Sequence, residues 1–383
     1  NVLSEIQAHL EPQECQMAYN KPAKNLWTPL FYAAYQGHPD IIRMLLNQST
    51  RVDVFDENGE APLHVAVERG KEEVVDILLQ HDAFVNVRNK LGMTPLHLAA
   101  KLGFNSIVKQ LVSDHGAILD AMTITKQTPL HLAAESGQFE VCKTLMKLRA
   151  DLNAADNHSQ TPVHLAAQKN HAEVLKHFLN DRSELLTIPN KMGYNCAHIA
   201  AMNGSLSVIK ELLRFNRDAV IGVRIKKTGS TTLHLASEGG HAAIVKLLLS
   251  AGAKASDENA LGETALHLAA KHGHVKVLHT IKTAVDWKIC SRRNGLTALH
   301  VAASSGQTEF VAEMLRYRVP GGLRSERSGV DPKSDYGVTP LHMASRNGHE
   351  SVVRMLLNSA GVQVDAATEI ERYIPMHLAA QGG

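Results

Sequence analysis

This sequence of 383 residues has few large aromatic rings, no long apolar run and no closely spaced cysteines. Each scarcity excludes a class of protein. Phe, Trp and Tyr make up only 4% of the residues, so the core has to be built from Leu, Val, Ile and Ala. No apolar run approaches the roughly 20 residues of a membrane-spanning helix, so the sequence predicts no span. The cysteines lie far apart, which indicates isolated reduced thiols in a cytosolic protein; they are Cys15, Cys142, Cys196 and Cys290. The net charge of +2 favours no partner by itself.

The sequence instead contains a repeat. The segment Thr94–Ala100 reads Thr-Pro-Leu-His-Leu-Ala-Ala, and variants of it recur every 33 to 36 residues, with one gap of 42. The copies begin at Thr28, Ala61, Thr94, Thr128, Thr161, Asn195, Thr231, Thr264, Thr297 and Thr339, with an eleventh start at Ile374. This period predicts stacked repeats, so a length that would suggest two or three ordinary domains corresponds to one elongated array. Such arrays offer long surfaces and rarely catalysis.

Each copy predicts two short helices. Thr at the N-cap offers its hydroxyl to a free amide of the first turn, and Pro at the first helical position needs no N–H. Gly, or Asn170 in one copy, follows the first helix and suits a left-handed reversal. A second, amphipathic helix comes next, for example over residues 73–79, and then a polar loop. Helices of about ten residues are unstable alone, so the stability must come from stacking.

Departures from the repeat also carry predictions. Ala61 lacks a capping oxygen, which should cost its helix about 1 kcal/mol. Four copies replace the Pro by a residue that a helix tolerates; these are Cys196, Thr232, Ala265 and Ala298. Two connections are longer than the others, 214–230 and 316–338. The second contains Pro320, Gly321, Gly322 and Pro332, which predicts an irregular loop.

The two ends of the chain predict that it is part of a longer array. Val2, Leu3, Ile6 and Leu10 have the spacing of a second helix, so residues 1–27 are interpreted as the end of a preceding repeat plus a linker. Residues 28–373 hold ten repeats, and residues 374–383 are the truncated start of another. Neither end has a polar capping repeat, and we expect further repeats on both sides.

The 22 histidines do not indicate a metal or an acid–base site. Ten occupy one position of the motif, where identical placement serves the repeat unit; they are His64, His97, His131, His164, His198, His234, His267, His300, His342 and His377. The local cluster of His272, His274 and His279 lacks partners at zinc-ligand spacing. We recognise no nucleophile elbow, phosphate loop or Cys–His pair. The sequence therefore predicts no catalytic, cofactor-binding or metal-binding residue, and no enzyme.

Charge is distributed unevenly along the chain. Residues 1–190 contain 17 basic and 22 acidic residues, whereas residues 191–383 contain 23 and 16. Much of the basic excess lies in irregular loops, where it is either solvated surface or a ridge that meets an anionic partner. The candidate contacts are Arg214, Arg217, Arg224, Lys226, Lys227, Arg292, Arg293, Arg316 and Arg318. Nucleic acid is not expected, because no aromatic stacking residues accompany them.

The motif Thr94–Ala100 and its copies resemble the ankyrin repeat over almost the whole chain. This resemblance implies an all-α solenoid of helix-turn-helix pairs with β-hairpin fingers, curved into a superhelix. The segments Gly193–Ala201, Val208–Asn216 and Gly361–Thr368 are further similar to the ankyrin domain of the no-mechanoreceptor-potential (TRPN) class of transient receptor potential channels. That resemblance implies a cytoplasmic spring beneath the plasma membrane, which tethers a homotetrameric cation channel to microtubules and transmits force to its gate. The pore segments are not in this chain.

A static scaffold that binds protein partners in its concave groove is the alternative. The groove candidates follow the Ala pair of each motif, and they form no apolar or single-sign stripe; they are Tyr35, Glu68, Lys101, Glu135, Gln168, Met202, Glu238, Lys271, Ser304 and Arg346. A regulatory array fused to an enzyme is a third interpretation. The full-length sequence would separate the three.

Overall fold

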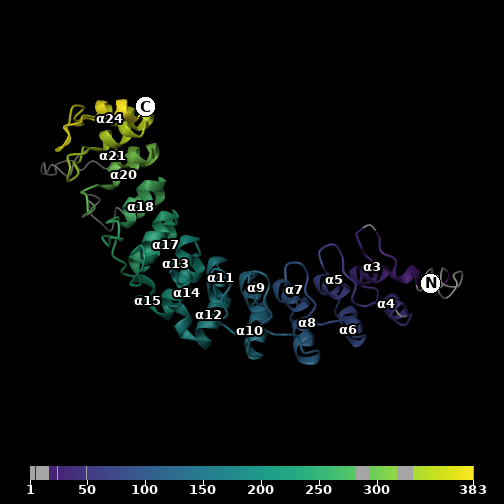
Figure 1. The fold of residues 1–383 in the computed structure, drawn as a ribbon. Coiled ribbons are helices and arrows are strands. Elements are labelled where there is room, and N and C mark those ends of the chain that lie inside the picture. Colours follow the sequence, from purple (N-terminus) through teal and green to yellow (C-terminus); the bar gives the residue numbers. More distant parts are fainter. Residues whose placement is uncertain are drawn as a thin grey trace. The chain divides into compact units, whose positions relative to one another are not determined.

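Short helices in pairs make up nearly all the regular structure of the described residues (Figure 1). The computed structural model describes residues 5, 17–23, 25–48, 50–281, 291, 293–316 and 331–382. The chain divides into unit 1, residues 1–185 with 190–192, and unit 2, residues 186–189 with 193–383. Each unit is described by itself.

The described residues of unit 1 from Pro29 onward form five helix pairs, in which the first helices and the second helices form two rows (Figure 1). The pairs are α3 (Pro29–Gln36) with α4 (Pro39–Leu46), α5 (Pro62–Glu68) with α6 (Glu72–Gln80), α7 (Pro95–Leu102) with α8 (Asn105–Lys109), α9 (Pro129–Glu135) with α10 (Phe139–Lys147), and α11 (Pro162–Gln168) with α12 (Ala172–Asp181). A π-helical turn at Gln110–Asp114 extends α8, and a 3₁₀ turn at Ser183–Leu186 follows α12.

Unit 2 continues the pattern with one addition. Its helices are α13 (Cys196–Met202), α14 (Leu206–Phe215), α15 (Arg217–Ile221), α16 (Thr232–Glu238), α17 (Ala242–Ser250), α18 (Ala265–His272), α19 (Val275–Ile281), α20 (Ala298–Ser304), α21 (Thr308–Arg316), α22 (Pro340–Arg346), α23 (Glu350–Leu357) and α24 (Pro375–Gly382). The added helix is α15, which occupies part of the long connection 214–230. In the other long connection, residues 317–330 lie outside the described residues, as do Val2, Leu3, Ile6 and Leu10.

The helix starts agree with the sequence argument and add one contact to it. Every motif Pro opens a first helix, as predicted. Most motif threonines face the amide of the third helical residue in a capping box, as Thr94 does. The threonine hydroxyl also donates to the motif histidine, and Thr94 Oγ1 lies 2.8 Å from His97 Nδ1. The capping bond itself is shortest at Asn195, whose Oδ1 accepts from His198 N at 3.0 Å, and it is longer at Thr339.

The loops between repeats reverse direction without forming strands in the described part of the chain. In the loop that contains Asn89, for example, Asn89 N donates to Met93 O at 3.0 Å and Gly92 N to Asn89 O at 2.8 Å. The expected β-hairpin fingers are thus present as turns, and an isolated antiparallel bridge joins Arg224 and Thr231. The backbone bonds of the Asn89 loop close turns and form no ladder. These loops are called fingers below.

The core is built from aliphatic side chains, as the composition predicts. Leu, Val, Ile and Ala of both helices are buried, and Phe31, Phe178 and Phe310 are the largest fully buried side chains. Burial of each Leu, Val or Ile contributes about 1.5–3 kcal/mol. First helices pack on the first helices of neighbouring repeats, as in α5 with α7, and second helices do likewise, as in α4 with α6. Among the described residues, no helix is long and apolar enough to cross a bilayer.

Candidate interaction surfaces

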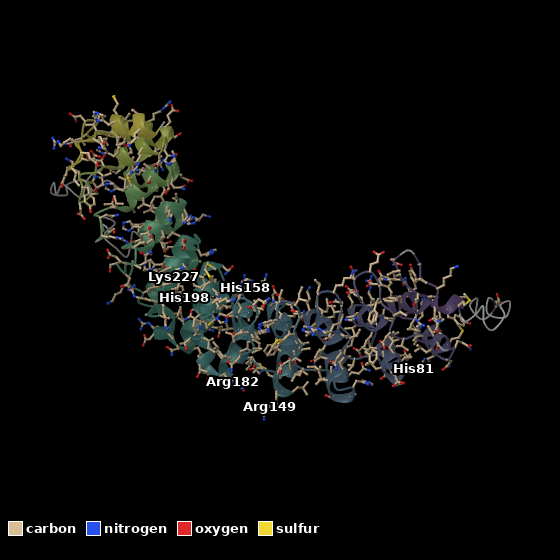
Figure 2. All side chains as sticks on the ribbon, in the orientation of Figure 1. His81, Arg149, His158, Arg182, His198 and Lys227 are labelled. Atoms are coloured by element: carbon tan, nitrogen blue, oxygen red, sulfur yellow. The ribbon has the colours of Figure 1, made fainter. Side chains whose placement is uncertain are left out.

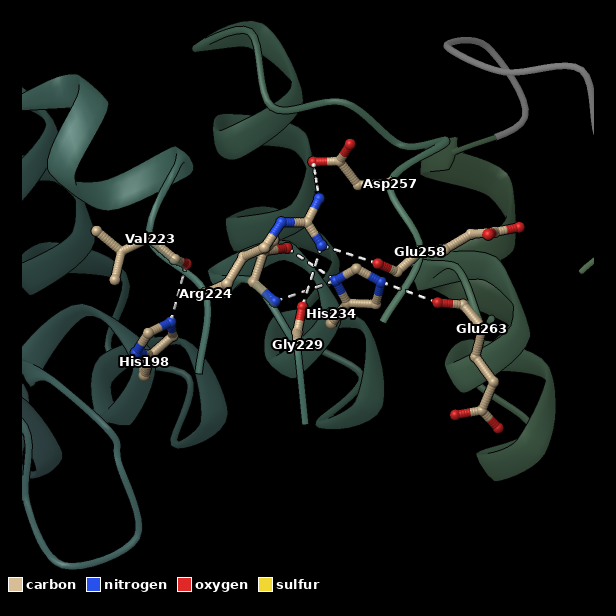
Figure 3. A network of polar contacts seen from close by, with 9 residues as sticks. His198, Val223, Arg224, Gly229, His234, Asp257, Glu258 and Glu263 are labelled. Atoms are coloured by element: carbon tan, nitrogen blue, oxygen red, sulfur yellow. Dashed lines mark hydrogen bonds and ion pairs between the residues drawn. The ribbon is translucent and has the colours of Figure 1, made fainter. Parts of the chain in front are cut away.

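Most of the motif histidines hold successive repeats together. In each, Nδ1 accepts from the N–H of the motif's first residue, and Nε2 donates to a carbonyl of the following finger at 2.9–3.2 Å. These histidines are His64, His97, His131, His198, His234, His267, His300 and His342. This arrangement requires the neutral ring with its proton on Nε2. Figure 3 shows two such bonds, from His198 to Val223 O and from His234 to Glu263 O.

The environment of these rings favours their neutral form. Burial lowers the pKa of His64, His97, His198 and His300 to about 4, so they stay neutral. In the part of the chain that the structure describes, no group of three or more His, Cys, Asp or Glu side chains could hold a metal ion. Both observations agree with a structural role.

A second row of polar bonds joins the repeats near the turns. The residue before a second helix donates from its side chain to a carbonyl at the end of the preceding repeat's first helix, at 2.8–3.3 Å. The pairs are Gln138 with Lys101, His171 with Glu135, His241 with Met202, His274 with Glu238, Gln307 with Lys271, and His349 with Ser304.

The second row explains why glycine stands at the turns. Gly306 has φ +69°, and a Cβ on it would lie only 2.8 Å from Nδ1 of His349. A Cβ on Gly137 would lie 2.5 Å from the His171 ring. The motif glycine therefore serves the next repeat as well as its own turn.

The predicted groove residues all lie at the ends of first helices. The backbone carbonyls of many of them accept the hydrogen bonds of the second row. Their side chains are at least partly exposed and remain chemically mixed. Tyr35 is covered on one face by Arg69, whose guanidinium carbon lies 3.8 Å from the ring centroid, and it also contacts Trp27. Lys169 pairs with Glu135 at 3.5 Å. No stripe of one chemical type emerges along this row.

The predicted basic residues that the structure describes fall into three groups. Arg224 is bonded within the array: it pairs with Asp257 at 3.1 Å and donates to Glu258 O at 2.8 Å and Gly229 O at 3.1 Å (Figure 3). It thus joins two fingers. Lys226, Lys227 and Arg293 are exposed on fingers, with Lys227 marked in Figure 2. Arg292 and Arg318 lie outside the described residues.

Three other basic residues lie on the side of the second helices. Arg214 pairs with Glu211 at 2.6 Å and Arg316 with Glu313 at 2.9 Å, while Arg217 donates through Nε to Ala251 O. In unit 1, the equivalent edge, formed by the ends of the second helices, carries His81, Arg149 and Arg182 (Figure 2).

Two neighbouring fingers of unit 1 expose apolar side chains that the sequence argument did not single out. The exposed fractions are 67% for Phe84, 57% for Leu91, 57% for Ile118, 44% for Met122 and 63% for Ile124. Fingers are expected to be polar, so a run of bulky side chains there was the available signal. These five residues are called the finger patch.

The comparison with protein families matches almost the entire array. The family model described as ankyrin repeats in three copies matches residues 5–89, 84–156, 149–225, 198–286 and 277–368. One 35-residue stretch is 49% identical to the phosphate system positive regulatory protein PHO81 of Saccharomyces cerevisiae, over 9% of this chain and 3% of that protein. That likeness has the length of one repeat and does not distinguish a scaffold from a channel. The family matches and the paired helices together show that the chain belongs to the ankyrin-repeat proteins.

Proposed function

We propose that this chain is a protein-binding ankyrin array and that the finger patch is a contact surface for its partner. The carrying observation is the exposure of five large apolar side chains on two adjacent fingers, Phe84 to Ile124. Such clusters on a soluble surface are typical of interaction sites. Ankyrin repeats generally serve protein–protein interaction, which agrees with this assignment.

The backbone beneath the finger patch is held in place by bonds between the two fingers. Ile118 N donates to Asn86 Oδ1 at 2.8 Å, Ile124 N donates to Leu91 O at 3.1 Å, and Arg88 donates to Met122 O. A surface that is already ordered loses little conformational entropy on binding. The finger patch is therefore preorganised for contact.

Basic side chains border the finger patch. Arg88, Lys90 and Lys126 are exposed on the same two fingers. They favour a partner that combines apolar and acidic groups, since rim charges steer association and select partners. We propose the row of groove candidates from Tyr35 to Arg346 as a second contact surface of the same array, with side chains of mixed chemical type.

Selection of peptides tests this function. A displayed library is selected against the wild-type chain, and the recovered peptides are then titrated against Leu91→Asn/Ile124→Asn. The matched control is Leu261→Asn, which changes a finger residue of the same 57% exposure in unit 2. Peptides that lose at least tenfold in affinity for the double variant and less than twofold for the control support the proposal. Equal binding to all three proteins, or no enrichment at all, contradicts it.

A second candidate function is the spring of a mechanically gated channel, with the chain tethering a tetrameric pore to microtubules on the cytoplasmic side of the plasma membrane. Its supporting observation is that the main helix contacts in each unit join consecutive repeats, so that small angular changes add along the array. Force spectroscopy tests it. Linear, reversible extension before any repeat unfolds supports a spring, whereas rupture at low extension opposes one.

A further inference from the structure

A basic groove lies between consecutive second helices of unit 2. It is a cavity of about 350 Å³ between the C-terminal parts of α14 and α17, lined by Lys210, Leu213, Arg214, Arg217, Leu247 and Ser250. We propose that this groove binds a linear acidic segment of a partner protein, whose carboxylates meet the cations while an apolar side chain rests on the two leucines. The inference rests on the proposed function as a protein-binding array, but it concerns a different surface.

Two of the three cations of the basic groove, Lys210 and Arg217, form no ion pair among the described residues. Lys210 is exposed and has no hydrogen-bond or ion-pair partner among the described residues. Arg214 pairs with Glu211 at 2.6 Å, which leaves most of its guanidinium in solvent, its side chain being 75% exposed. Residues 206–218 and 242–254 together contain five basic and two acidic side chains. A positive field of this kind attracts carboxylates.

Arg217 is held in position at the groove wall. It is the first residue of α15, in the long connection, and its Nε donates to the carbonyl of Ala251 at the end of α17. Its guanidinium also lies against Gly252, where a side chain would collide with it. One donor thus fixes the group, and the others remain for a carboxylate, which guanidinium binds with charge-assisted hydrogen bonds.

The shape of the basic groove favours a peptide over larger or flatter partners. A volume of about 350 Å³ is at the lower end for ligand pockets and accommodates one or two side chains rather than a folded surface. Leu213 and Leu247 supply an apolar contact between the charges. No aromatic ring lines the cavity, so bases of a nucleic acid would find no stacking partner.

An equivalent groove later in unit 2 provides an internal comparison. A cavity of about 530 Å³ lies between α21 and α23. Counted from the motif residue of each repeat, its Leu315, Arg316 and Met355 correspond to Leu213, Arg214 and Leu247. Ala312 replaces Lys210, and both of its arginines pair with glutamates, Arg316 with Glu313 and Arg354 with Glu350. The equivalent position with fewer free cations predicts weaker binding there.

The test uses a fluorescein-labelled peptide of sequence Glu-Glu-Leu-Asp-Glu-Glu and the complete chain, with anisotropy measured at 50 mM and 300 mM NaCl. We expect the wild type to bind, with affinity falling at the higher salt. Lys210→Glu/Arg217→Glu should weaken binding at least tenfold. The matched control is Lys246→Glu/Lys254→Glu, which makes the same charge change on the same stretch of unit 2 outside the cavity lining, and it should change the affinity less than threefold.

Several outcomes overturn the inference. They are the absence of binding by the wild type, equal losses in both double variants, or equal affinity for a Lys-Lys-Leu-Lys-Lys-Lys peptide. Sedimentation with phosphatidylserine vesicles that succeeds while the peptide fails would assign the groove to a membrane surface instead. Lys210→Glu alone, which breaks no bond in the array, guards against misfolding, because it should weaken binding with an unchanged circular dichroism spectrum.

The two proposals fail independently. The variant Lys210→Glu/Arg217→Glu should still bind the library peptides whose affinity depends on the finger patch. If it loses both, the array itself is damaged. If the selected peptides depend on Leu91 and Ile124 while the acidic peptide binds nowhere, the proposed function stands and this inference falls.

Discussion

Substitution of Gly306 by Ala should destabilise both its own turn and the contact with the next repeat. Gly306 has φ +69°, and a Cβ there would lie 2.8 Å from Nδ1 of the His349 ring. The ring in turn donates from Nε2 to Ser304 O at 2.9 Å. The added methyl group must displace the ring, so one change affects both a turn and an inter-repeat bond.

The expected magnitude has two parts. An L-residue held in the left-handed region costs about 1–2 kcal/mol. Loss of the His349–Ser304 bond adds about 0.5–1.5 kcal/mol. We therefore expect Gly306→Ala to cost about 1.5–3.5 kcal/mol in local opening free energy. Gly348→Ala is the matched control, because φ there is +67° and nothing lies within 4 Å of the added Cβ. It should cost only the first part.

A double-mutant cycle separates the two parts. The cost of Gly306→Ala is measured in the wild type and in His349→Ala, from amide hydrogen exchange of α20 and α22 with urea unfolding alongside. Local exchange is preferred because a repeat array need not unfold in one step. In His349→Ala the ring is gone, and the cost should fall to about 1 kcal/mol. An equal cost in both backgrounds would refute the steric argument.

Two further predictions concern buried titratable groups. His64, His97, His198 and His300 have a native pKa of about 4 against an ordinary 6.5, so the unfolded state binds more protons between these pH values. The free energy of unfolding should therefore fall as the pH is lowered from 6.5 to 4, by up to about 3 kcal/mol for each ring. Acid titration followed by circular dichroism checks this, and a stability independent of pH across that window contradicts it. Burial raises the pKa of Cys142 and Cys196 to about 12. In a Cys15→Ser/Cys290→Ser chain, neither remaining thiol should react with a thiol reagent at pH 8 until urea unfolds the array. Rapid labelling of the native chain would contradict the burial of these thiols.

The sequence predicts the helices well because their signals are local. Pro at the first helical position and glycine at the turn act within a few residues, so the motif places each first helix correctly. The aliphatic, aromatic-poor composition likewise predicts the core. The sequence did not predict that the threonine hydroxyl also donates to His97 Nδ1, because that contact depends on how the ring is buried beside it.

The interaction surfaces depend on residues that stacking brings together. The distribution of charge along the sequence singled out Arg224 as a partner contact. In the structure its side chain instead pairs with Asp257, which lies 33 positions away on the neighbouring finger. The finger patch joins Leu91 to Ile124 across two repeats. The basic groove joins Lys210 on α14 to Leu247 on α17. None of these neighbours is adjacent in sequence.

The sequence by itself determined the repeat period, the helix pairs, the turn glycines and the absence of a recognisable catalytic motif. The helix pairs and the turn glycines follow from backbone preferences and hydrophobic spacing within a single repeat, and the period follows from its recurrence. Only the tertiary structure decided which polar groups form bonds between the repeats and which remain exposed on the surface. The physical reason is that a side chain's partner lies about one repeat away, at a distance set by how one repeat packs on the next.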